Sequence, residues 1–138
     1  MSEIFKNADN TSATGKDFDV IIIGAGFAGM YMLHRMREMG LKSIVFEAGD
    51  GVGGTWYWNR YPGARCDVES VQYSYQFDKE LEQEWTWSEK YSPQPEILKY
   101  ANHVADRFKL RKDIRFNTRI TSSNYDEKKA EWELVAEQ

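Results

Sequence analysis

A glycine-rich turn at residues 24–29 carries the strongest chemical signal in the sequence. It has the sequence GAGFAG, so Gly24, Gly26 and Gly29 have the GxGxxG spacing between an apolar run and a helical stretch. In such a turn the first glycine permits a sharp bend, the second lets a pyrophosphate approach the backbone, and the third lets helix and strand pack closely. The free N–H groups at the start of the helix can then face the phosphates. The motif therefore predicts the binding of a dinucleotide.

An acidic residue, Glu47, completes this motif at the end of the next expected strand. Its carboxylate can accept hydrogen bonds from both ribose hydroxyls of an adenosine, and its charge would repel a 2′-phosphate. The site is therefore expected to prefer FAD or NAD over NADP. A glycine-rich turn in an unrelated α/β protein is the alternative, and the order of strand, turn, helix and acid disfavours it.

A second glycine cluster distinguishes between the two dinucleotides. Gly53 and Gly54 follow Glu47 closely and lead into Thr55 and Trp56. In a plain NAD-binding domain another helix usually follows the second strand. Here the backbone of a glycine cluster can pass close to a second part of a cofactor, such as the ribityl chain and flavin of FAD. An ordinary surface loop with a packed tryptophan is the alternative.

Two strands and one helix are expected to position these residues. Residues 18–23 and 41–47 are short runs rich in β-branched residues, typical of parallel strands that are buried on both faces. Residues 28–39 between them are expected to form a helix that ends at Gly40. This βαβ unit predicts an α/β, Rossmann-like fold with a parallel sheet.

The second half of the chain is expected to contain a helix and a C-terminal β-hairpin or meander. The helix begins at the two prolines of residues 93–95, and its apolar positions keep helical spacing as far as Phe108. Alternating apolar residues over 114–120 predict a half-buried strand. A polar turn at 126–129 leads to a further strand at 132–135.

Two segments lack such patterns. Residues 67–92 show no clear period and are expected to be irregular. Residues 1–16 are polar and are interpreted as a flexible leader. Residues 17–138 then form one domain, which suits a chain of this length.

Composition excludes several classes of protein. The chain has 138 residues and a net charge of −4, which argues against a nucleic-acid-binding protein. The mean hydropathy is −0.68 and no apolar run is long enough to span a membrane. Cys66 is the only cysteine and no signal peptide is visible, which predicts a cytoplasmic protein. Because one cysteine and two histidines cannot form a typical structural zinc site, such a site is not expected, and no metal is predicted.

The block GGTWYWNRYPGARCDVES at residues 53–70 resembles the flavin-dependent Baeyer–Villiger monooxygenases. The glycine turn, Glu47 and Tyr73 match as well, so that the resemblance extends over residues 17–135. It implies an enzyme that binds FAD, reduces it with NADPH and uses O₂ to convert ketones to esters or lactones through a C4a-peroxyflavin. A second GxGxxG for NADPH does not occur here. The chain is therefore interpreted as the first segment of the FAD-binding domain, incomplete relative to the family.

The resemblance also implies roles for individual residues. Asp67 would be the catalytic group, because the matching aspartate lies beside an active-site arginine and tunes its charge. No arginine of this chain matches that one. Arg65, Cys66 and Asp67 match a segment that also touches NADP, and Ile120 matches a residue near the adenine. The cofactor-binding residues expected are Gly24, Gly26, Phe27, Gly29, Glu47, Gly54, Thr55, Trp56, Tyr57, Trp58, Arg65, Cys66, Asp67, Tyr73 and Ile120.

Two other functions stay open. The chain could be a segment of an N-hydroxylating or flavin-containing monooxygenase that acts on amines or sulfides, or a non-catalytic nucleotide-binding fragment. An isolated first segment should leave sheet edges and apolar faces uncovered. Its expected partners are therefore the remaining flavin and NADPH domains or a second copy, together with the ketone and O₂ in a complete enzyme.

Overall fold

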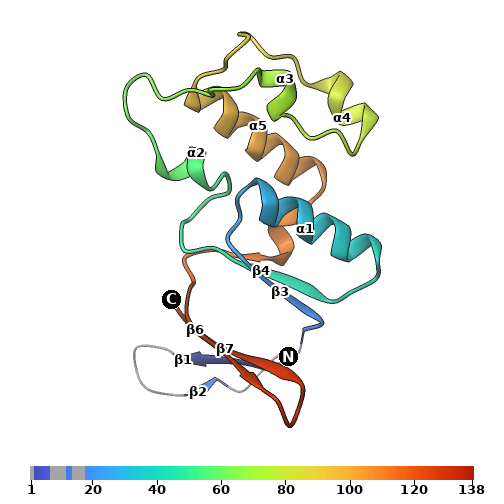
Figure 1. The fold of residues 1–138 in the computed structure, drawn as a ribbon, viewed down its shortest axis with the longest axis vertical. Helices are drawn as coiled ribbons and strands as arrows, with labels where there is room; N and C mark the ends of the chain where they lie inside the picture. The colour runs from blue at the N-terminus through green and yellow to red at the C-terminus, as the bar shows by residue number, and fades with distance from the viewer. Residues whose placement is uncertain (1, 7–11, 14–17) are drawn as a thin grey trace.

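The computed structural model describes residues 2–6, 12–13 and 18–138, and it has three parts (Figure 1). Helices α3, α4 and α5 lie at one end, a small parallel sheet with α1 lies in the middle, and a β-hairpin lies at the other end. Both ends of the chain lie on the side of the hairpin. None of the described helices is long and apolar enough to cross a membrane.

The middle part is a three-stranded parallel sheet with the strand order β3-β4-β5. β3 (Val20–Ile23) and β4 (Ser43–Phe46) pair in register, and β5 (Ile114–Arg115) pairs with the end of β4. α1 (Phe27–Glu38) connects the first two strands. The Rossmann-like βαβ unit that the sequence predicted is confirmed.

One hydrophobic core joins the sheet to α1 and to the end of α5 (Gln94–Arg107). Met30 and Leu33 project from one face of α1 and have no exposed surface. Ala101 and Ala105 occupy one face of α5 in the same way. The spacing of three and four residues places both pairs on the sides of the helices that pack against the sheet and its connections.

The strand expected at residues 114–120 is in fact two strands in different sheets. β5 ends at Arg115, and β6 (Arg119–Asp126) begins after Asn117, whose φ of 53° is left-handed. The N–H of Asn117 donates to the carbonyl of Gly49 at 2.9 Å instead of extending the strand. The prediction of one continuous strand was wrong because asparagine tolerates this conformation, so the alternating pattern continues across the break.

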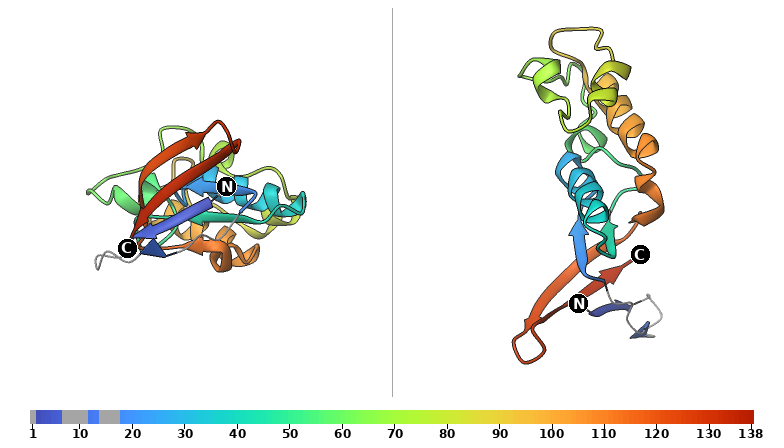
Figure 2. Two further views of the ribbon diagram at one scale, coloured as in Figure 1. Left: turned by 90° about the horizontal axis from the view of Figure 1, so that it is seen from below. Right: turned by 90° about the vertical axis from the view of Figure 1, so that its right-hand side faces the viewer.

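The second sheet contains the C-terminal hairpin, which is confirmed. β6 pairs antiparallel with β7 (Glu131–Glu137), and the hairpin projects from the body of the molecule (Figure 2). β1 (Ser2–Lys6) pairs parallel with β7, and β2 (Ser12–Ala13) pairs with β1. The sequence did not predict these two strands. The remaining residues of the expected flexible leader lie outside the described part of the chain, so its flexibility stays a prediction.

Short helices occupy the segment that was expected to be irregular. α3 (Ser70–Tyr73) and α4 (Lys79–Glu84) precede α5, which begins after Pro93 as predicted. Helices this short have little intrinsic stability, so tertiary contacts must hold them.

Two charged residues attach α4 to the rest of the helical end. The carboxylate of Asp78 accepts the N–H of Leu81 at 2.8 Å and so caps α4. This bond, assisted by the neighbouring Arg107, holds the pKa of Asp78 below its ordinary value. Arg107 of α5 also pairs with Glu80 and Glu84 at 3.1 Å and 2.5 Å, so α4 is fixed against α5.

Replacing Asn117 tests the break between the two sheets. Asn117→Val should lower the free energy of unfolding by about 1–2 kcal/mol, because a β-branched residue is strained at a left-handed φ. Asn117→Gly keeps the backbone N–H and adopts this conformation freely, so it serves as the matched control. Urea unfolding of the three proteins measures the difference. A valine variant as stable as the glycine variant would contradict the break.

Candidate dinucleotide-binding site

The first glycine loop connects β3 to α1 and has the geometry that the motif predicts. Gly24 has a left-handed φ of 92°, and its N–H donates to the carbonyl of Phe46 at 2.7 Å. Gly26 is the N-cap of α1. A Cβ on Gly29 would lie 1.9 Å from the carbonyl oxygen of Gly24, so no other residue fits there without moving the helix.

Glu47 follows β4 and is almost completely buried, with 4% of its surface exposed. Its Oε2 accepts the N–H of Ala25 at 2.6 Å, and its Oε1 accepts the N–H of Gly49 at 2.8 Å. These are charge-assisted bonds, which are stronger than bonds between neutral groups. Each carboxylate oxygen can still accept another donor. Glu47 therefore fixes the first glycine loop besides facing the site.

The second glycine loop lies directly against the first. Gly54 has a left-handed φ of 54°, and a Cβ on it would lie 2.9 Å from the Cα of Gly26. The N–H of Gly53 donates to the carbonyl of Ala25 at 3.0 Å. α2 (Thr55–Trp58) begins at this point. The two loops can approach this closely only because the second loop has glycine at position 54.

Two adjoining cavities extend along the glycine loops. The first has a volume of about 430 Å³ and contains Glu47 and Ile120 in its walls. The second has a volume of about 300 Å³ and contains Trp56 and Tyr73. Five residues belong to both cavities: Ile23, Gly24, Gly26, Gly54 and Thr55. Because they share these residues, the two cavities form one elongated space. This shape suits a ligand with two ends joined by a narrow middle part.

Most of the residues that the sequence assigned to cofactor binding line these cavities. They are Gly24, Gly26, Phe27, Gly29, Glu47, Gly54, Thr55, Trp56, Trp58, Tyr73 and Ile120. Of these residues, Trp58 lines the cavity that contains Glu47. Their contacts with a cofactor stay predictions.

Tyr57 and Cys66 do not line either cavity. The hydroxyl of Tyr57 donates to Asp50 at 2.6 Å. A Cβ on Gly49 would lie only 2.6 Å from the ring of Tyr57. Cys66 is buried in a small core with Trp56. Tyr57 thus packs against Gly49 and Gly51, and Cys66 packs against Trp56, which lines the second cavity.

Asp67 and Arg65 lie on a surface loop that is tied down at both ends. The N–H of Cys66 donates to the carbonyl of Ser92 at 3.0 Å, and the N–H of Ser70 donates to that of Lys90 at 2.8 Å. Arg65 pairs with Glu89 at 3.0 Å. Asp67 between these ties is exposed, and its catalytic role stays a prediction.

Several lining residues were not found from the sequence. Thr118, Arg119, Ala48 and Asn59 line the cavity that contains Glu47. Thr118 and Arg119 reach it because the chain turns at Asn117, and that turn was not predicted. Among the described residues no group of three His, Cys, Asp or Glu side chains is placed to hold a metal ion.

An aromatic cluster packs against the first turn of α1. The ring of Phe27 lies 5.3 Å from that of Tyr73 and 5.2 Å from that of Tyr75. The hydroxyl of Tyr75 donates to the carbonyl of Phe27 at 2.5 Å, and burial raises the pKa of this hydroxyl above its ordinary value. The hydroxyl of Tyr73 in turn accepts the indole N–H of Trp56 at 2.8 Å. Both glycine loops are therefore tied to the helical end.

Comparison with known proteins agrees with this geometry. The family model of the NAD(P)-binding Rossmann-like domain matches residues 22–103, and the chain belongs to this family. The chain is 46% identical over 130 residues to a Baeyer–Villiger monooxygenase of Pseudooceanicola batsensis, covering 94% of this chain and 24% of that protein. The resemblance drawn from residues 53–70 is thus confirmed.

Further relatives carry more specific names. Phenazine N-monooxygenase PhzNO1 of Lysobacter antibioticus is 54% identical over 86% of this chain and 22% of its own length. A solved structure of oxidized steroid monooxygenase bound to NADP superimposes with a TM-score of 0.85 at 59% identity, over 88% of this chain and 25% of that one. A structure of OTEMO in complex with FAD and NADP has a TM-score of 0.82 at 47% identity, over 86% and 22%. The chain thus spans about a quarter of the length of these proteins.

Replacing Glu47 tests its role in the protein without a ligand. The amide of Glu47→Gln has one oxygen, so it can accept only one of the two backbone N–H groups and leaves the other buried and unpaired. The free energy of unfolding should fall by about 1–3 kcal/mol. Glu127→Gln, in the exposed hairpin turn, is the matched control and should change little. Urea unfolding measures both, and equal stability of the two variants would contradict the assignment.

Proposed function

We propose that residues 18–138 form the adenosine- and pyrophosphate-binding part of an FAD site. The observation that carries this proposal is the contact between the glycine loops, with a Gly54 Cβ position 2.9 Å from the Cα of Gly26. A single glycine loop would serve any dinucleotide. The second loop opens a further cavity towards Trp56 and Tyr73, where the flavin end of FAD has room.

The residues present fit such a cofactor. A Cβ on Gly26 would face the common part of both cavities, so its absence leaves a path to the backbone for a pyrophosphate. The remaining acceptor capacity of Glu47 suits the ribose hydroxyls. Thr118 and Ile120 would border the adenosine, and Tyr73 the flavin.

The complete protein is proposed to be an NADPH- and O₂-dependent monooxygenase that converts ketones to esters or lactones. This proposal is supported by the similarity of the chain to a Baeyer–Villiger monooxygenase and to solved structures of monooxygenases in complex with NADP or with FAD and NADP. Bound FAD would supply the oxygen-transfer chemistry. This chain would bind and orient it, and the exposed carboxylate of Asp67 would be free to orient a guanidinium from another part of the protein. The remaining flavin and NADPH domains are the proposed partners. A cytoplasmic location is proposed because Cys66 is a free thiol.

A second candidate is a monooxygenase that acts on nitrogen. It is favoured by the 54% identity to a phenazine N-monooxygenase. Offering a ketone and an aromatic amine to the complete protein separates the two, because the oxygenated products differ in mass and in the atom that carries the oxygen. If the complete protein binds FAD but oxygenates neither substrate, the hypothesis of a non-catalytic nucleotide-binding function is favoured.

A methyl group on Gly26 tests the proposed path for the pyrophosphate. Gly26 has an ordinary φ of −76°, and its Cβ would meet the Cα of Gly54 at 3.5 Å, so Gly26→Ala should fold normally. The methyl group would nevertheless occupy the approach to the backbone, and the affinity for FAD should fall at least about tenfold. Quenching of flavin fluorescence measures the affinity, and thermal unfolding checks the fold. A folded variant with unchanged affinity would contradict the proposed binding mode.

The hydroxyl of Tyr75 is expected to support this binding through α1. Tyr75→Phe keeps the ring and deletes one hydrogen bond to Phe27, so the affinity for FAD should fall roughly 2- to 10-fold. The loss should also be seen with ADP and not with adenosine, because the first turn of α1 faces the phosphates. Tyr31→Phe is the matched control, since that ring lies 6.2 Å from Tyr75 and is partly exposed. Equal losses with ADP and adenosine would assign Tyr75 a purely structural role.

A further inference from the structure

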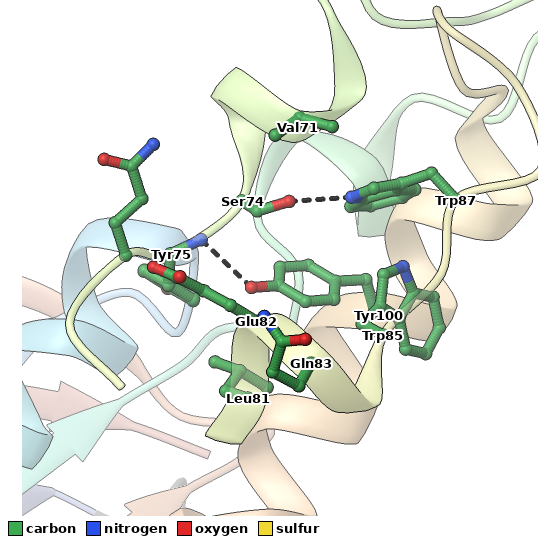
Figure 3. A pocket seen from close by; sticks show the side chains of 10 residues that line it. Val71, Ser74, Tyr75, Leu81, Glu82, Gln83, Trp85, Trp87 and Tyr100 are labelled. Atoms are coloured by element: carbon green, nitrogen blue, oxygen red, sulfur yellow. Dashed lines mark hydrogen bonds between the residues drawn. The ribbon is translucent and has the colours of Figure 1, made fainter. Parts of the chain in front are cut away.

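A separate pocket lies among α3, α4 and α5, and it shares no lining residue with the two cavities on the glycine loops. Its volume is about 440 Å³, within the range of roughly 300–1,000 Å³ that is usual for small-molecule pockets. Figure 3 shows the rings of Tyr75, Trp85, Trp87 and Tyr100 around this space, with Glu82 on α4 beside it. Neither the proposed function nor the motifs of the sequence account for it.

The rings of Trp85, Trp87 and Tyr100 pack into a continuous wall, in which the two tryptophans are partly exposed and Tyr100 is almost completely buried. The ring of Trp87 lies 5.0 Å from that of Tyr100, and the ring of Trp85 lies 5.2 Å from Tyr100 and 5.6 Å from Trp87. The faces of such rings carry partial negative charge and attract cations. The indole N–H of Trp85 is itself buried, so it is not accessible to a ligand in the pocket.

Two side chains and one backbone N–H that line the pocket donate hydrogen bonds within the protein. The indole N–H of Trp87 donates to the hydroxyl of Ser74 at 2.7 Å, and that hydroxyl donates to the carbonyl of Ser70 at 3.0 Å. The backbone N–H of Tyr75 donates to the hydroxyl of Tyr100 at 3.0 Å. These three donors are therefore not free to bind an anion.

Glu82 supplies an uncompensated negative charge. Its neighbours Glu80 and Glu84 both pair with Arg107, whereas the carboxylate of Glu82 has no ion pair or hydrogen bond within the described part of the chain. Glu82 lines the pocket, and its charge adds to burial in raising the pKa of the Tyr100 hydroxyl. The pocket thus combines π faces with one free carboxylate.

We propose that this pocket binds an organic ammonium ion of the tertiary or quaternary alkyl class, with its methyl groups against the aromatic wall and its charge balanced by Glu82. Such an ion offers few or no hydrogen bonds and needs no donors from the protein. Aromatic side chains with a nearby carboxylate provide the complementary environment. This inference does not depend on FAD binding.

A pair of isosteric probes tests the proposal with the whole 138-residue chain. Choline carries a quaternary nitrogen, and 3,3-dimethylbutan-1-ol has a carbon at the same place and no charge. Both are titrated at constant ionic strength up to tens of millimolar, and binding is followed by tryptophan fluorescence and by calorimetry. Choline should bind at least about fivefold more tightly than the alcohol. Equal affinity, or no saturable binding of choline to the folded chain, would overturn the proposal.

Substitutions at two exposed residues test whether a carboxylate at this pocket balances the charge of the ligand. Glu82→Gln should weaken choline binding about 3- to 10-fold and leave binding of the alcohol unchanged. Gln83→Glu, which adds a carboxylate to the lining of the same pocket, should strengthen choline binding. Glu127→Gln is the distant control and should have no effect. Choline affinity that is indifferent to both pocket substitutions would also overturn the proposal.

Discussion

The buried carboxylate of Glu47 is the interaction on which the arrangement of the site depends. A buried charge without partners is very unfavourable, so the chain must supply donors for both of its oxygens. It does so with the backbone N–H groups of Ala25 and Gly49, which belong to segments on either side of β4. The carbonyl of Glu47 also accepts the N–H of Thr118 at 2.9 Å. One residue therefore brings together three segments that are distant in the sequence, and these segments enclose the first cavity.

Close approach of backbone to backbone is the second constraint, and the rest of the fold keeps it in place. Gly26 and Gly54 meet where any side chain on the second loop would collide. α1 must then be held at both of its ends, or the loops would separate. Tyr75 bonds the carbonyl of the first helical residue, and at the other end Arg37 bonds Asp113 and the carbonyls of two residues after α5. Helices α3 to α5 and the 3₁₀ turn η1 (Leu110–Asp113) thus support the site, although none of them lines the first cavity.

Much of the site could be predicted because its signals are local. The spacing of Gly24, Gly26 and Gly29 demands a particular backbone path, and the apolar runs beside it allow only a buried strand and a packed helix. The positions of Asp67, Thr118 and Arg119 could not be predicted in this way. They depend on hydrogen bonds between segments about 20 to 70 residues apart, such as those of Cys66 with Ser92 and of Asn117 with Gly49. No local sequence pattern indicates such a bond.

Local sequence patterns were sufficient to predict the βαβ unit, the dinucleotide motif, the helix after Pro93 and the C-terminal hairpin, because periodicity and glycine spacing act over a few residues. The packing of the whole chain established that the strand expected at 114–120 breaks at Asn117, that Glu47 joins the loops, and that Trp58 lies in the cavity with Glu47. It also decided that Trp85, Trp87 and Tyr100 enclose a separate pocket beside Glu82. The reason is physical, since burial and hydrogen-bond pairing are satisfied between segments, and the choice of partner belongs to the packed molecule as a whole.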